Sequence, residues 1–290
     1  MNGRKPAAAG QFYPARKEEC LQQMKQCLSE GITAEKLPET IRAGIVPHAG
    51  WVFSGPLAGS VFSALSKINN VIDTFIIFGA AHRYFGTKPA VYRKGSWESP
   101  LGSIEIDEET ASKLIDKDTA ADDSAAHAAE HSIEVQIPFI QHLFSTARIV
   151  PVLVPPVKRA VYLGHTAAAV AAEDKKNIVC IGSTDLTHYG PGYGFAPKGS
   201  SQQGLKWATE VNDKRLINLI LQMQAEDILP EAAENHNACG AGAIAATIAF
   251  ARRRGVKKAE LLAHTDSGSI MAEKMGTTSS ESVGYASIVF

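Results

Sequence analysis

Continuous apolar runs alternate along the chain with longer segments in which apolar residues recur at helical spacing. The apolar runs predict strands, which cover residues 42–46, 74–78, 148–154, 177–181, 261–264 and 285–289. The segments with helical spacing cover residues 17–28, 56–65, 132–144, 160–172, 205–224 and 241–253. Residues 89–106 predict a β excursion with turns at Gly95 and Gly102. Unbroken apolar strands between helices indicate an α/β fold, in which helices cover both faces of a mainly parallel sheet.

The chain shows no internal repeat, no low-complexity tract and no clear linker. We therefore expect one domain over residues 1–290, because α/β folds often exceed about 200 residues as a single unit. Within it, Pro56 is expected in the first turn of its helix, where its missing N–H costs nothing. The acidic segment 116–123 is expected to be an exposed loop.

Charge and composition exclude several classes of function. Of the 290 residues, 45% are hydrophobic and 20% are charged, and the formal net charge is -1. Lysines and arginines are scattered, and the run 252–254 is expected to end a helix, where cations suit the dipole. Neither nucleic acid nor a membrane surface is therefore an expected partner.

The expected location is the cytoplasm. No stretch is long and apolar enough to span a bilayer, and the basic start MNGRKPAAAGQFYP lacks the apolar core of a signal peptide. Four cysteines, Cys20, Cys27, Cys180 and Cys239, form no CxxC pair. Such sparse usage suits a reducing compartment without structural disulfides.

Polar motifs directly follow three of the predicted strands. IVPHAGWVFSG carries His48, FIIFGAAHRYFG carries His82, and IVCIGSTDLTHYG carries Asp185 and His188. The carboxyl ends of parallel strands share one edge of a sheet, so these side chains are expected to converge there. A lone histidine is more often a satisfied core or surface residue, but two histidines at strand ends favour a metal site.

Cys239 is the expected third ligand of a redox-active metal ion. It stands just before the apolar helical segment 241–253, and a helix N-terminus stabilises the thiolate that binds metals. The alternative, a small buried hydrophobe, is the interpretation we give to Cys180 inside its apolar strand. Two imidazoles and one anionic ligand leave coordination positions open for substrate or oxygen.

Asp185 and His188 form a D-x-x-H motif with predicted catalytic roles. Histidine moves protons near neutral pH, and the Asp185 carboxylate can orient an imidazole. The alternative is a helix cap at Thr184 or Asp185.

The segment AHAAEHSIEVQIPF adds further candidates around the site, namely His127, Glu130, His131 and Glu134. His131 and Glu134 share a helix face if a helix begins there. We expect His131, Glu134 and Trp51 to touch substrate or to support the ligands. The alternative is a helix capped by Ser132, with Glu134 on a solvated face.

Seven of these motifs together resemble the Memo family. They are GQFYP, PHAGWVFSG, FGAAH, W-x-SPLG, EHSIEVQIPF, STDLTHYG and N-x-CG-x-G-A, in order from about Ala8 to the C-terminus. The resemblance is greatest to the prokaryotic branch, the AmmeMemoRadiSam system protein B type. It implies one domain with a mixed central sheet flanked by helices, similar to the class III extradiol dioxygenases. It also implies a small-molecule substrate, with a radical-SAM protein and an AMMECR1-type protein as pathway partners.

The resemblance implies roles for individual residues. Those dioxygenases hold iron(II) with two histidines and a glutamate, and a further histidine is the acid/base. His48 and His82 match the two histidine ligands, Cys239 falls where the glutamate would be, and His188 with Asp185 beside it matches the acid/base. Iron(II) is the expected metal, but a thiolate is softer than a carboxylate and also suits copper or zinc. Ring cleavage of catechols therefore does not follow from the resemblance.

Three functions are compatible with these residues. The first is a metal-dependent, dioxygenase-like oxidoreductase. The second is a metal- or peptide-binding module that kept the pocket without the chemistry. The third is a metal-free cysteine hydrolase that uses Cys239 with His188 and Asp185, which requires Cys239 within hydrogen-bond reach of a base.

Overall fold

The central strands of the sheet are the apolar runs that the sequence predicts. The computed structural model describes residues 3–31, 37–69 and 71–290. Four strands lie side by side and parallel in the order β1-β8-β2-β7. Their bounds are β1 Ala43–Val46, β2 Thr74–Gly79, β7 Arg148–Leu153 and β8 Ile178–Ser183. Every position of β1, β2 and β8 is buried, as expected for strands covered on both faces.

Antiparallel strands extend this parallel core on both sides. β11 (Ser282–Val289) pairs antiparallel with β1, with β10 (Glu260–Asp266) and with the short β9 (His188–Tyr189). Beyond β7 lie β3 (Ala90–Val91), which is antiparallel to β7, and β6 (Ala121–Asp122). Within the described residues the sheet thus has nine strands and is mixed, with a parallel centre. The predicted fold class is confirmed.

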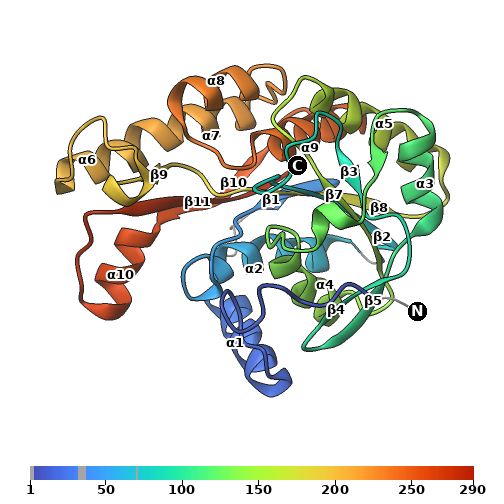
Figure 1. Cartoon of the computed structure of the whole chain (residues 1–290), viewed down its shortest axis with the longest axis horizontal. Coiled ribbons are helices and arrows are strands. Elements are labelled where there is room, and N and C mark those ends of the chain that lie inside the picture. The colour runs from blue at the N-terminus through green and yellow to red at the C-terminus, as the bar shows by residue number, and fades with distance from the viewer. Residues whose placement is uncertain (1–2, 32–36, 70) are drawn as a thin grey trace.

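Helices cover both faces of the sheet (Figure 1). On one face α9 packs on β1, β2 and β8, with α5 beside it, and on the other α2 packs on β1 and β11 above α1 and α4. Their bounds are α1 Lys17–Glu30, α2 Trp51–Ile68, α4 Ile137–Leu143, α5 Arg159–Glu173 and α9 Ala241–Arg253. The remaining elements are α3 Glu108–Asp116, α6 Gln202–Trp207, α7 Lys214–Leu221, α8 Ile228–Asn235, α10 Ser267–Met275, and the hairpin of β4 Ser96–Ser99 and β5 Gly102–Glu105.

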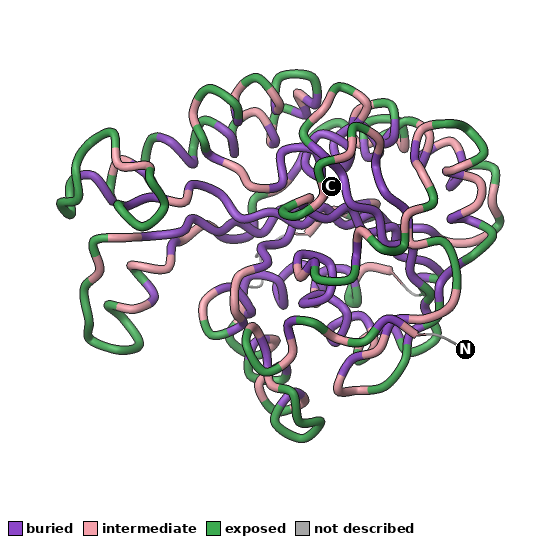
Figure 2. Tube along the Cα trace, viewed as in Figure 1, coloured by how far each residue is buried: buried purple, intermediate pink, exposed green. Residues whose placement is uncertain are grey.

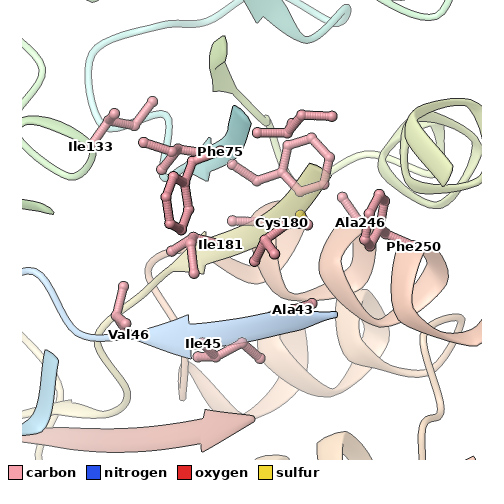
Figure 3. Packing of buried hydrophobic residues seen from close by; sticks show 14 of the residues in the cluster. Ala43, Ile45, Val46, Phe75, Ile133, Cys180, Ile181, Ala246 and Phe250 are labelled. Atoms are coloured by element: carbon pink, nitrogen blue, oxygen red, sulfur yellow. The ribbon is translucent and has the colours of Figure 1, made fainter. Parts of the chain in front are cut away.

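The hydrophobic core lies between the sheet and these helices. Figure 2 shows buried positions running along the central strands, while exposed positions gather on the outer helices and loops. In Figure 3, Ala246 and Phe250 of α9 lie on the side of β8 to which Cys180 points, while Ile181 points to the other side. Cys180 is fully buried, which confirms its interpretation as a core residue.

Some helix boundaries differ from the prediction because distant contacts set them. α2 begins at Trp51, so Pro56 lies inside the helix instead of in its first turn. The Trp51 N–H donates to the carbonyl of Phe12, a tertiary contact that no local pattern reveals. In the segment predicted as one helix from 132 to 144, only Ile137–Leu143 is α-helical, and Glu134–Gln136 is a short 3₁₀ turn.

Two further predictions are corrected. The helix predicted at 205–224 is α6 and α7 with a π-helical segment, Ala208–Asp213, between them. The acidic segment 116–123 is not wholly a loop, since it ends α3 and contributes β6. None of the helices in the described ranges combines the length and hydropathy needed to cross a bilayer.

Candidate metal centre

The polar residues after β1, β2 and β8 meet at one edge of the sheet. His48 follows β1, His82 follows β2, and Asp185 and His188 follow β8, and all four line one cavity of about 530 Å³. The prediction that these four side chains converge at one edge of the sheet is confirmed. Gly79 ends β2 in close contact with this region: a Cβ there would lie 2.5 Å from Cγ1 of Ile133. A larger residue at this position would displace the loop that follows His131.

His48 presents one defined nitrogen toward the cavity. The Ser183 hydroxyl donates its single proton to the Ser132 carbonyl at 2.7 Å, so its oxygen accepts from Nδ1 of His48 at 3.0 Å. Nδ1 therefore carries the proton, and the lone pair is on Nε2. Burial, reinforced by the neighbouring His82, lowers the pKa of His48 to about 3. His48 is thus a neutral imidazole ready to bind a metal.

His82 is oriented by a buried carboxylate. Oε1 of Glu130 accepts from Nδ1 of His82 at 3.0 Å, and Oε2 accepts the His82 backbone N–H at 3.1 Å. Backbone N–H groups of His131 and Ser132 also donate to Oε1, each at 2.9 Å. Burial alone would raise the pKa of Glu130, but the hydrogen bond and charge of His82 lower it well below its usual range. This carboxylate–histidine pair is a common support for metal-binding imidazoles.

His131 joins the two predicted histidine ligands. His48, His82 and His131 each offer one ring nitrogen, and these three nitrogens lie within 4.8 Å of one another. The three histidines can therefore hold a metal ion. The His131 ring stacks on His82 with centroids 4.9 Å apart and lies 4.3 Å from the ring of Phe12. Burial lowers the pKa of His131 to about 4, which keeps it neutral. The sequence placed His131 only among the supporting residues, because a turn of unknown geometry carries it.

Cys239 contacts His48 directly. Its sulfur lies 3.2 Å from Nε2 of His48 and accepts the Asp185 backbone N–H at 3.2 Å. Burial, and then the nearby Asp185 carboxylate, raise the pKa of this thiol. Cys239 precedes α9 and is half-buried, so desolvation and the Asp185 carboxylate oppose the thiolate that the helix N-terminus was expected to stabilise.

Asp185 and His188 occupy different parts of the cavity. Oδ1 of Asp185 accepts the backbone N–H of His48 at 2.7 Å, and burial raises the pKa of Asp185. Nδ1 of His188 lies 3.2 Å from the Leu186 carbonyl, so it carries a proton, and Nε2 is the nitrogen able to accept one. No helix begins at Thr184 or Asp185, since β9 follows instead, and the capping alternative is excluded.

Glu134 and Trp51 lie behind the cavity. Glu134 is fully buried, where it pairs with Arg4 at 2.7 Å and accepts the Tyr13 hydroxyl at 2.9 Å. Because residues 134–136 form a 3₁₀ turn, His131 and Glu134 do not share a helix face. Trp51 is buried, and its indole N–H donates to the Val135 carbonyl at 3.0 Å. Both residues hold the 130–136 loop from the side opposite the cavity.

His127 and His236 also lie away from the cavity. His127 is fully buried, and its Nε2 donates to the Ala90 carbonyl at 3.0 Å. His236 caps α8 in a left-handed backbone conformation. Neither residue lines the cavity.

Most of the remaining walls of the cavity come from segments that the sequence analysis did not link to the site. They are aromatic and apolar, with a few polar groups at the outer end: Phe12, Phe53, Tyr193, Met271, Val283, Tyr285, Ser267, Ser279 and Glu281. Most come from α10, β11 and the residues between them. Apart from Phe12 and Phe53, which stand in the GQFYP and PHAGWVFSG motifs, no local motif marks these residues, and the pairing of β11 with β9 brings those of β11 to the β8 edge.

The donor set fits a metal ion. His48 and His82 each have Nδ1 engaged by a hydrogen-bond partner, which directs Nε2 away from that partner. The ring of His131 supplies a third nitrogen donor beside them, whereas Cys239 is outside this group of three and the cavity lining, and its sulfur contacts Nε2 of His48. Imidazole and thiol donors suit iron, copper and zinc better than magnesium or calcium.

Comparisons with known proteins agree on one family. A family model described as Memo-like protein matches residues 4–289. A MEMO1 family protein of Thermococcus onnurineus is 38% identical over 295 residues, which cover 99% of each chain. MEMO1 family proteins of Methanopyrus kandleri and Pyrobaculum arsenaticum are 36% and 35% identical, and each match covers at least 98% of both chains. Because the model and these relatives span nearly the whole chain, the protein belongs to the Memo family.

Proposed function

We propose that this Memo-family protein binds one redox-active metal ion through His48, His82 and Cys239, and that it is a dioxygenase-like oxidoreductase for a small organic substrate. Iron(II) is the expected metal, and copper or zinc are the alternatives that a thiol ligand favours. The observation that carries the proposal is the 3.2 Å contact between Nε2 of His48 and the Cys239 sulfur, beside a carboxylate-oriented His82.

The chain's own residues supply the rest of the chemistry. A bound metal would act as a Lewis acid and redox centre at the cavity edge. Nε2 of His188 accepts or returns a substrate proton, since its Nδ1 is engaged by the Leu186 carbonyl. Asp185 holds the backbone of His48 and so keeps the ligand in place. The apolar walls limit water around the reacting groups.

His131 is the competing third ligand. Its ring nitrogen belongs to the same compact group as those of His48 and His82. Cys239 is preferred because its sulfur already contacts Nε2 of His48, and because ionised sulfur would balance the charge of the metal. As a neutral imidazole beside the ligands, His131 would instead contact the substrate.

Cobalt(II) distinguishes the two ligand sets. Protein purified without oxygen is analysed for metal and then loaded with cobalt(II), whose charge-transfer absorption reports thiolate ligation. Cys239→Ser should abolish the sulfur absorption and weaken binding, whereas His131→Ala should retain that absorption. His142→Ala, at an exposed position, is the control. Sulfur absorption that survives in Cys239→Ser would contradict the ligand set.

Oxygen consumption separates the three functions. An oxidoreductase consumes oxygen with its substrate, and His188→Ala should lose turnover while keeping the metal. Tight metal binding without oxygen consumption would indicate a binding module instead. A metal-free protein with an alkylatable Cys239 needed for activity would favour the hydrolase, with His48 as the base in place of the predicted His188, because Nε2 of His48 lies 3.2 Å from the sulfur. The pathway partners implied by the resemblance, a radical-SAM protein and an AMMECR1-type protein, remain part of the proposal.

A further inference from the structure

The π-helical segment Ala208–Asp213 lies outside the cavity but contacts the loop that carries His188 and the segment that leads to Cys239. π-helical turns insert a residue into a helix and are frequent at functional sites. Here the segment joins α6 to α7, and its last two residues, Asn212 and Asp213, are almost completely buried. Both side chains point to Thr187, which directly precedes His188.

Thr187 has every polar group engaged. Its backbone N–H donates to Oδ1 of Asp213 at 3.0 Å, and its hydroxyl accepts from Nδ2 of Asn212 at 3.1 Å. Its carbonyl accepts the Gly284 N–H at 3.0 Å. A Cβ at Gly284 would overlap Oδ2 of Asp213, so this carboxylate sits directly against β11. The backbone that carries His188 is thus held from the π-helical segment and from β11.

Asn212 also reaches the loop that carries Cys239. Its side-chain Nδ2 donates to the Asn235 carbonyl at 2.8 Å, and its backbone carbonyl accepts from Nδ2 of Asn237 at 3.0 Å. Asn237 is fully buried and lies two residues before Cys239. The Cys239 N–H in turn donates to the Asp185 carbonyl at 3.3 Å, which connects this loop to the Asp185–His188 segment.

We infer that Asn212 is a positioning residue that holds the Cys239 loop and the His188 loop in fixed relation, so that the thiol and the imidazole serve one site. The inference rests on the proposed function for the roles of Cys239 and His188. The contacts themselves do not depend on a bound metal. A single amide on a different element bridges the two loops, and truncating it removes donors to both at once.

The test compares Asn212→Ala with Asn218→Ala, which removes an exposed amide from the same helical stretch. In Asn212→Ala the cobalt(II) affinity should fall by about 10- to 100-fold, the range typical for residues that support metal ligands. The thiolate-to-cobalt absorption should also weaken. Asn218→Ala should match the wild type in both. Wild-type affinity and sulfur absorption in Asn212→Ala would overturn the inference.

A metal-free measurement separates this inference from the proposed function. Iodoacetamide alkylation of Cys239, followed peptide by peptide, should be several-fold faster in Asn212→Ala, while buried Cys180 stays protected. If the wild type gave no sulfur absorption with cobalt(II), the proposed function would fail, and alkylation would still decide the inference. Equal acceleration at Cys180 would indicate general loosening and overturn it. If Asn212→Ala does not fold, Asn237→Ala, which removes the donor from the Cys239 loop to Asn212 and to Glu231 but leaves Thr187 bonded to Asn212, should give the same selective result.

Discussion

The guanidinium of Arg4 and the carboxylate of Glu134 form a buried ion pair, 2.7 Å long, between residues 130 positions apart. The same guanidinium donates to the carbonyls of His127 and Glu130, at 2.8 and 2.6 Å. The N-terminal segment therefore holds the loop that carries Glu130 and His131. The segments around Arg4 and Glu134, which are far apart in the sequence, therefore form one structural unit.

Arg4→Ala should lower the free energy of unfolding by about 3–5 kcal/mol, because it leaves a buried carboxylate without its charge partner. Urea denaturation measures the change. The control is Lys5→Ala, whose ion pair with Glu98 is exposed and should contribute only about 0–1 kcal/mol. Equal losses in the two variants would contradict a structural role for the buried pair.

Glu130→Gln should weaken metal binding by about 10- to 100-fold, because a neutral amide orients His82 less well than a carboxylate. Competition with a chromophoric chelator measures the affinity. Glu226→Gln, which removes an exposed carboxylate that pairs with Arg252, is the matched control. An unchanged affinity in Glu130→Gln would show that His82 is not a ligand or needs no support.

His127 should make the protein less stable as the pH falls from about 6.5 to 4. Burial, helped by the charge of Arg4, lowers the pKa of His127 to about 4, and Asp123 and Glu130 only partly oppose this. An unfolded histidine titrates near about 6.5, so between these values the unfolded state binds more protons. The contribution of His127 to the free energy of unfolding is fully present above about pH 6.5. It is lost as the pH falls toward about 4, by at most about 3 kcal/mol.

The measurement is the free energy of unfolding against pH for the wild type and His127→Gln, which keeps an N–H for the Ala90 carbonyl. The slope below pH 6.5 should be smaller in the variant. Parallel curves would mean that His127 contributes nothing to the acid sensitivity.

Gly79→Ala should destabilise the protein by about 1–3 kcal/mol, because the added methyl would overlap Ile133 and Ser132. Metal affinity should fall with it, since the displaced loop carries His131. Thermal unfolding and cobalt(II) titration measure the two effects. Gly50→Ala is the control for stability, because its added methyl would meet nothing closer than 3.6 Å. A Gly79→Ala protein as stable as Gly50→Ala would refute the close packing.

The local pattern of the sequence was sufficient to predict the fold and part of the site. Strands such as Thr74–Gly79 are unbroken apolar runs, and a run of that kind is stable only inside a sheet covered on both faces. Because parallel strands end at one edge, the positions of His48, His82 and Asp185 after their strands were sufficient to predict a shared cavity.

Only the tertiary structure decided which groups complete that cavity and how they are charged. His131 lines the cavity and Glu134 does not, because residues 134–136 form a 3₁₀ turn that Arg4 and Trp51 hold in place. Burial and the Asp185 carboxylate raise the pKa of the Cys239 thiol, which opposes the effect of the helix dipole that the sequence suggested. Protonation, tautomer and side-chain direction depend on neighbours that are distant in sequence, such as Ser183 beside His48, and these neighbours exist only after folding.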